Sequence, residues 1–142
     1  MSEREISEQI AHLMREVGYR AELAQDDLIK SGAGGLSFQI TVFAGHSIQC
    51  WLGIGPTEPD DFSDTDVFAF NKKYRFAKSY VRIGDTGIRS IMLEQDFLFD
   101  VTLPDAAVKI REILDIWERS SAYLKTAMRN PALLQDETPK AE

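Results

Sequence analysis

The chemically reactive side chains of this chain are few, and they form no familiar catalytic pattern. One cysteine, Cys50, lies in an alternating apolar run, and the two histidines, His12 and His46, are far apart in the sequence. No positive group that would stabilise a thiolate is expected beside Cys50, so we interpret it as a small core side chain. His12 has no second ligand at metal-binding spacing and is expected on a solvated helix face. His46 is expected in a turn, and the sequence gives a catalytic triad no support.

An acidic stretch and a glycine-rich stretch are the other candidates for chemistry. Five carboxylates could gather a cation, namely Glu58, Asp60, Asp61, Asp64 and Asp66. Their spacing lacks the internal glycine and the closing glutamate of a calcium loop, so we interpret them as a solvated acidic segment. Residues 32–35 are rich in glycine, but no Lys-Ser/Thr pair follows to reach a phosphate, which favours a connection between strands. We therefore expect no enzyme, no metal and no cofactor.

Length and charge limit the remaining classes of function. A chain of 142 residues with 44% apolar and 27% charged residues is typical of one globular domain. Its net charge of -7 argues against nucleic-acid binding, which depends on attraction to phosphates. No apolar run approaches the roughly 20 residues of a membrane span, and the polar start is unlike a signal peptide. We expect a single cytoplasmic domain over residues 1–130 and a mobile polar tail over residues 131–142.

Three helices are predicted from caps and apolar periodicity. Ser2 and Glu5 have the spacing of a capping box, and the apolar face that follows ends at Gly18. A second helix from Asp64 to about Tyr74 is expected to begin after a Ser63 cap. The longest, of about 25 residues, opens at residues 102–105 and ends at Asn130-Pro131.

Alternation predicts the strands between these helices. Residues 19–31 alternate weakly, with a turn expected at Asp26-Asp27, and suggest one short, broken strand. The clearest strand is residues 36–43, and residues 48–54 return antiparallel to it. The side chains expected to face the core are Leu36, Phe38, Ile40, Val42, Ile48, Cys50, Leu52 and Ile54.

The stretch around Gly87 predicts a β-hairpin with a three-residue loop, Asp85-Thr86-Gly87. Glycine suits the last loop position because it takes a positive φ without steric cost. A two-residue loop would instead set Arg82 against Arg89, a like-charge pair. With Gly84 opposite Ile88, one face carries the pairs Val81–Ile91 and Ser79–Leu93, and the other carries Tyr80–Met92 and Lys78–Glu94.

Three segments of this region resemble the YbjN domain. They are Phe68-Ala69-Phe70-Asn71-Lys72-Lys73-Tyr74-Arg75-Phe76-Ala77-Lys78-Ser79-Tyr80, Gly84-Asp85-Thr86-Gly87 and Leu93-Glu94-Gln95-Asp96-Phe97. The resemblance implies an α+β fold in the order α-β-β-β-α-β-β-α, with an antiparallel sheet of about five strands packed against the N- and C-terminal helices. That architecture is similar to type III secretion chaperones and implies a scaffold for binding proteins.

The resemblance and the apolar side chains together lead to a functional hypothesis. We expect a non-enzymatic protein-binding module, chaperone-like or regulatory in sensory transduction, that acts as a homodimer and holds a protein partner. Chaperones of similar fold dimerise through the second helix and the next strand, so the expected dimer interface contains Phe68, Asn71 and Lys72. The expected partner-binding surface contains the outward sheet residues Phe43, Trp51, Tyr80 and Met92. The alternative is a small-ligand sensor or enzyme that uses the acidic loop 58–66 and the open sheet face.

Overall fold

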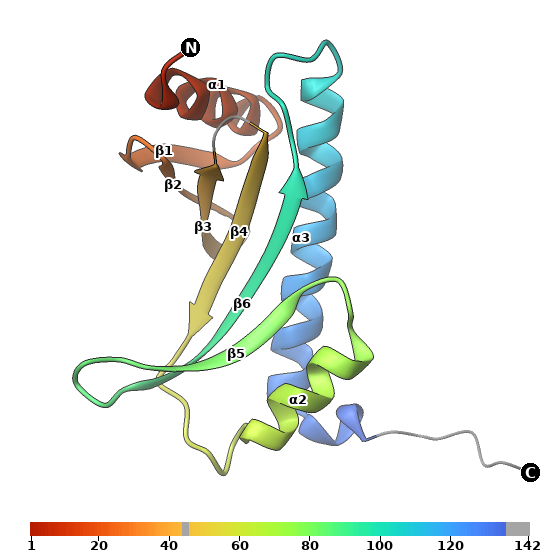
Figure 1. The fold of residues 1–142 in the computed structure, drawn as a ribbon. Coiled ribbons are helices and arrows are strands. Elements are labelled where there is room, and N and C mark those ends of the chain that lie inside the picture. Colours follow the sequence, from red (N-terminus) through yellow and green to blue (C-terminus); the bar gives the residue numbers. More distant parts are fainter. Residues whose placement is uncertain (44–45, 136–142) are drawn as a thin grey trace, which may run out of the picture. The chain divides into compact units, whose positions relative to one another are not determined.

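The computed structural model describes residues 1–43 and 46–135 and has an α+β fold, as predicted (Figure 1). Its elements are, in chain order, α1 (Glu3–Glu16), β1 (Arg20–Gln25), β2 (Leu28–Ala33), β3 (Leu36–Phe43), β4 (Ser47–Ile54), α2 (Asp64–Lys73), β5 (Lys78–Ile83), β6 (Arg89–Leu98), α3 (Ala106–Arg129) and the 3-10 turn η1 (Pro131–Leu134). The strands described form a six-stranded sheet in the order β1-β2-β3-β4-β6-β5. The pairs β1–β2, β2–β3 and β3–β4 are antiparallel.

Two compact units can be distinguished within the chain. The first contains residues 1–52 and 94–119, and the second contains residues 53–93 and residues from 120 onward. Strand β6 and helix α3 contribute residues to both units. The expectation of one domain over residues 1–130 stays a prediction.

Helix α1 in the first unit begins with the predicted capping box. The Glu5 backbone N–H donates to Ser2 Oγ at 3.1 Å, and the Ser2 N–H donates to Glu5 Oε1 at 3.1 Å. These two bonds satisfy backbone donors that no helical carbonyl can reach. The buried side chains of the helix, Ser7, Ile10, Ala11 and Met14, lie on one face. This local pattern was visible in the sequence and is confirmed.

The segment expected to be one broken strand forms two strands, β1 and β2, and this raises the strand number from about five to six. The chain turns at Asp26-Asp27. Ser7 Oγ donates to the carbonyl oxygen of Asp26 at 2.6 Å, and the Val42 N–H donates to that of Asp27 at 2.8 Å. Both partners are distant in sequence, so the alternation of residues 19–31 alone could not predict this hairpin. A bulge between Leu23 and Gln25 further weakens the alternation.

Strands β3 and β4 carry the core of the first unit in the predicted phase. Ile40 pairs with Cys50, and Val42 with Ile48, and all four side chains are buried. Leu36, Phe38 and Leu52 are also buried, whereas Ile54 is only half-buried. The Phe38 ring contacts Trp117 of α3 edge-on, with ring centroids 5.8 Å apart. The fully buried Trp117 therefore packs the first part of α3 against the buried face of β3.

The second unit is built on α2 and the β5–β6 hairpin. Ser63 and Asp66 form a capping box at the start of α2, and Val67 and Phe70 are the buried residues of the helix. In the hairpin the Gly84 N–H donates to the Ile88 carbonyl oxygen at 2.9 Å, and Gly87 has a φ of 81°. The predicted three-residue loop is thereby confirmed, because a positive φ at its last position is what makes glycine suitable there.

The C-terminal tail was expected to begin at Pro131. Residues 131–134 instead form the turn η1, in which Leu134 is buried, and Lys73 Nζ donates to the Leu133 carbonyl oxygen at 2.7 Å. Residues 136–142 lie outside the described part of the chain, so the mobility of the tail stays a prediction.

Candidate functional site

The reactive side chains occupy positions that suit structure better than catalysis. Cys50 is fully buried, and its burial, with a smaller contribution from Asp96, raises the pKa of the thiol far above its ordinary value. The thiolate needed for nucleophilic attack is therefore disfavoured. His12 Nε2 lies 2.5 Å from Glu16 Oε1 on the exposed surface of α1, and His46 Nδ1 lies 3.9 Å from Asp100 Oδ2.

Two of the five carboxylates in the acidic segment 58–66 have partners within the second unit. Asp66 completes the cap of α2 through the Ser63 N–H at 2.9 Å, and Asp64 Oδ1 lies 3.1 Å from Arg89 Nη2. The Arg89 side chain is only 10% exposed, so Asp64 neutralises a largely buried cation. Glu58, Asp60 and Asp61 are exposed. Within residues 1–43 and 46–135, no three His, Cys, Asp or Glu side chains gather in a way that could hold a metal ion.

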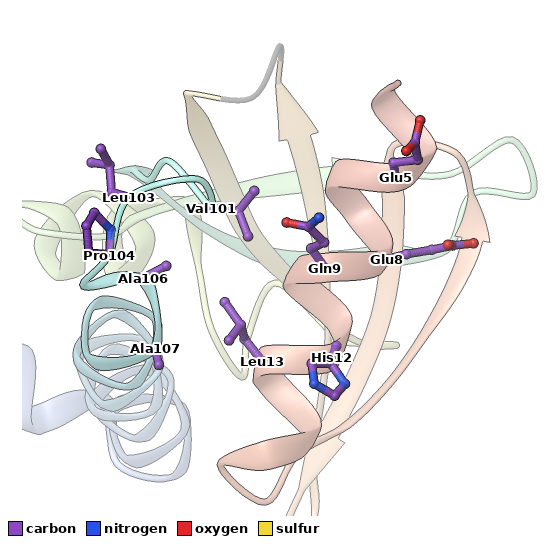
Figure 2. A pocket seen from close by; sticks show the side chains of 10 residues that line it. All are labelled: Glu5, Glu8, Gln9, His12, Leu13, Val101, Leu103, Pro104, Ala106 and Ala107. Carbon is purple, nitrogen blue, oxygen red and sulfur yellow. The ribbon is translucent and has the colours of Figure 1, made fainter. Parts of the chain in front are cut away.

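An open cleft in the first unit was not predicted from the sequence (Figure 2). Its volume is about 590 Å³, and it lies between α1 and the segment from Val101 to Ala107. The α1 side is mostly polar and the other side is apolar; the lining side chains are Glu5, Glu8, Gln9, His12, Leu13, Val101, Leu103, Pro104, Ala106 and Ala107.

The charged groups of this cleft already have partners. Glu8 pairs with Arg4 at 3.2 Å, His12 with Glu16, and Glu5 with the Ser2 backbone. The hydrogen bonds from Ser2 hold the pKa of Glu5 below its ordinary value. The only sequence signal for the cleft was Leu13, which belongs to the apolar pattern of α1 but is only half-buried. The cleft offers apolar surface without convergent unpaired polar groups.

The residues expected at a dimer interface lie on α2 in the second unit. Phe68 is 71% exposed and Lys72 is exposed, as an interface on that face requires. Asn71 differs, because its amide binds within the chain: Nδ2 donates to the Ser79 carbonyl oxygen at 2.9 Å, and Oδ1 accepts from the Ser79 N–H at 2.7 Å. The Asn71 amide thus joins α2 to β5 within the chain, and its expected role in the register of two copies stays a prediction.

The four residues expected on a partner-binding sheet face are divided between the two units. In the first unit, Phe43 is exposed, and Trp51 is half-buried with its Nε1–H donating to Thr41 Oγ1 at 3.0 Å. In the second unit, Tyr80 is at the limit of exposure, whereas Met92 is only 5% exposed. The expectation that Met92 is exposed is therefore wrong.

The absence of a side chain at Gly53 leaves room for the buried Met92 side chain. A Cβ atom built on Gly53 would lie 2.9 Å from the Met92 sulfur, so the thioether occupies the space that a side chain would fill. The exposed large apolar residues that the functional hypothesis did not include are Met1, Phe76, Ile83, Ile88, Leu98, Leu103, Val108, Ile116, Tyr123 and Leu133. Phe76 is the most exposed of them at 85%, and it follows the end of α2.

Comparison with known proteins adds a relationship of fold. No family model matches the chain, and no curated protein matches its sequence. The crystal structure of YbjN, a proposed transcription regulator from E. coli, matches with a TM-score of 0.61 over 85% of this chain and 87% of that chain. The fold is YbjN-like. Because the identity is only 10%, the likeness to YbjN concerns the fold alone.

Among the described residues, no helix combines the length and the apolar character needed to cross a membrane.

Proposed function

We propose that this YbjN-like protein is a non-enzymatic protein-binding module that acts as a homodimer, in a chaperone-like or regulatory role. The observation that carries the proposal is the exposure of Phe68 on α2. The opposite face of this helix already buries Val67 and Phe70, so Phe68 is not needed for the core of its own unit. A large aromatic side chain in this position is typical of contact surfaces.

The free energy gained by burying Phe68 can be compared with the free-energy cost of association. Burial of the exposed part of Phe68 would remove on the order of 100–150 Å² from water, worth about 2.5–4 kcal/mol per copy at about 25 cal/mol/Å². Association costs about 4–15 kcal/mol before any net affinity appears. Two copies of Phe68 therefore roughly offset this cost, and a stable dimer needs further apolar contact, for which the exposed Phe76, which follows the end of α2, is a candidate.

The regulatory version of the proposal is supported by the description of YbjN as a proposed transcription regulator. With a net charge of -7, we expect this chain to act through contacts with other proteins and not by direct binding to DNA. A single buried thiol fits the reducing conditions of the cytoplasm. The alternative of a ligand sensor or enzyme at loop 58–66 draws less support, because Asp64 and Asp66 already serve Arg89 and the α2 cap.

Light scattering on purified protein at micromolar concentration tests the homodimer. We expect a dimer for the wild type and a monomer for Phe68→Asp, because the new carboxylate would lose water without gaining a partner. Val108→Asp is the matched control, since Val108 is an exposed apolar residue on α3. A monomeric wild type would refute the dimer. A Phe68→Asp variant that stays dimeric would refute the assignment of the interface to α2.

Affinity capture from cell extract followed by mass spectrometry tests the protein-binding role. A chaperone or regulator should retain a defined protein partner. Retention of no protein above the background of an unrelated acidic control protein would contradict the proposed function.

A further inference from the structure

Strand β5 has one edge that pairs with β6 and a second edge that faces no other strand, because β5 is last in the sheet order. The hairpin fixes which backbone groups point to this open edge. The Gly84 N–H donates to the Ile88 carbonyl oxygen at 2.9 Å, and alternate residues of an antiparallel strand bond to the same neighbour. The residues whose N–H and C=O groups point away from β6 are therefore Ser79, Val81 and Ile83.

The side chain of Asn71 confirms this phase. Its amide accepts from the Ser79 N–H and donates to the Ser79 carbonyl oxygen, as the backbone of a neighbouring strand would. This amide covers the edge at one residue only. Val81 and Ile83 continue the edge beyond it, and Ile83 is 67% exposed. An unpaired edge of this kind can accept an extended segment as a further strand.

The cationic residues near this edge favour an incoming strand that carries acidic side chains. Residues 71–82 contain five cationic residues and no carboxylate, although the whole chain has a net charge of -7. Arg82 is exposed between the two open-edge residues, and counting from Gly84–Ile88 places Ser90 of β6 opposite it. Arg82 makes no ion pair within the described part of the chain. A carboxylate on an incoming strand could lie directly across from it.

A second copy of β5 fits this edge poorly. A two-fold axis at Val81 would set Ser79 against Ile83 of the partner subunit, but the Asn71 amide already occupies the Ser79 groups. A two-fold axis at Arg82 would set two arginines against each other, which is unfavourable.

We infer that the open edge of β5 binds an extended acidic segment of another protein. The segment pairs with the backbone of Val81 and Ile83, directs carboxylates toward Arg82 on one face and places apolar side chains beside Ile83 on the other. This inference rests on the proposed protein-binding function and names the chemistry of the partner. It does not depend on the homodimer.

Fluorescence anisotropy with two short blocked peptides tests the inference. One peptide alternates glutamate with valine, and the other has lysine in place of glutamate. We expect Arg82→Glu to weaken binding of the acidic peptide by about tenfold or more, because it reverses the charge facing the segment. Ile83→Pro should also weaken it, since proline removes an edge N–H that does not bond to β6. Lys30→Glu, which alters an exposed cation on β2, should change binding by less than about twofold.

Amide hydrogen exchange followed by NMR supplies the second readout. The amides of Val81 and Ile83 should gain protection when the acidic peptide binds. Three results would overturn the inference: equal binding of both peptides, no binding of the acidic peptide up to about 1 mM, or protection of both amides in the free protein. The last result would mean that a second copy or the chain's own tail fills the edge.

The outcome can be separated from that of the proposed function. Binding of the acidic peptide should persist in the Phe68→Asp variant whether or not that variant is monomeric. A protein that retains a defined partner from extract but does not bind the acidic peptide would contradict the inference about β5 alone.

Discussion

Replacing Asn71 by alanine should destabilise the second unit by about 1.5–5 kcal/mol, although the residue is only half-buried. The change removes two hydrogen bonds to the Ser79 backbone, at 2.7 and 2.9 Å. Ser79 is only 2% exposed, so its N–H and C=O would lose their partners in a buried position. Each such group costs about 1–3 kcal/mol, and the better helix propensity of alanine returns about 0.6 kcal/mol.

Urea denaturation followed by circular dichroism measures this loss. Lys72→Ala is the matched control, because Lys72 is the next residue on α2 and is exposed; its effect should stay within about 0.5 kcal/mol. Ser79→Ala keeps the backbone groups and removes only the hydroxyl, which bonds to Asn71 Oδ1 at 3.0 Å and to the Val67 carbonyl oxygen at 3.3 Å. It should therefore cost less than Asn71→Ala. A loss below about 1 kcal/mol for Asn71→Ala would refute the reasoning.

Three further predictions concern the core, the hairpin and a cap. Phe38→Ala should lower the free energy of unfolding by about 3–5 kcal/mol, and a loss below about 1 kcal/mol in chemical denaturation would contradict its core position. Gly87→Val should destabilise the protein much more than Thr86→Val in urea melts, because valine is strained at a φ of 81°; equal losses would contradict this. An NMR titration should show a lowered pKa for Glu5 that returns toward its ordinary value in Ser2→Ala. The stabilisation from Glu5 should be present above its unfolded-state pKa and be lost as the pH falls through the lowered value.

The features that the sequence predicted well depend on residues close together in the chain. The caps at Ser2 and Ser63 each join positions three residues apart, and the Gly87 turn is closed by Gly84 and Ile88. Strong alternation over residues 36–43 settled which side chains face the core. Such patterns can be predicted from the sequence because local hydrogen bonds and side-chain periodicity do not depend on which distant segment packs against the element.

The features that the sequence did not predict depend on distant partners. The two strands on either side of Asp26-Asp27 are supported by hydrogen bonds from α1 and β3, and the Met92 thioether lies in the space left by the missing side chain of Gly53. The cleft beside α1 needs the segment from Val101 to Ala107 as its second wall. No property of either segment alone indicates that they approach each other.

For Asn71, the sequence determined one part of its environment and the tertiary structure determined the other. The sequence alone determined that it lies on a helix beside the exposed Phe68, and that a strand and a glycine turn follow. Only the tertiary structure decided that its amide binds Ser79 and closes part of the β5 edge, leaving Val81 and Ile83 open. The physical reason is that periodicity fixes the direction of a side chain within its own element, whereas its hydrogen-bond partner depends on how two elements pack.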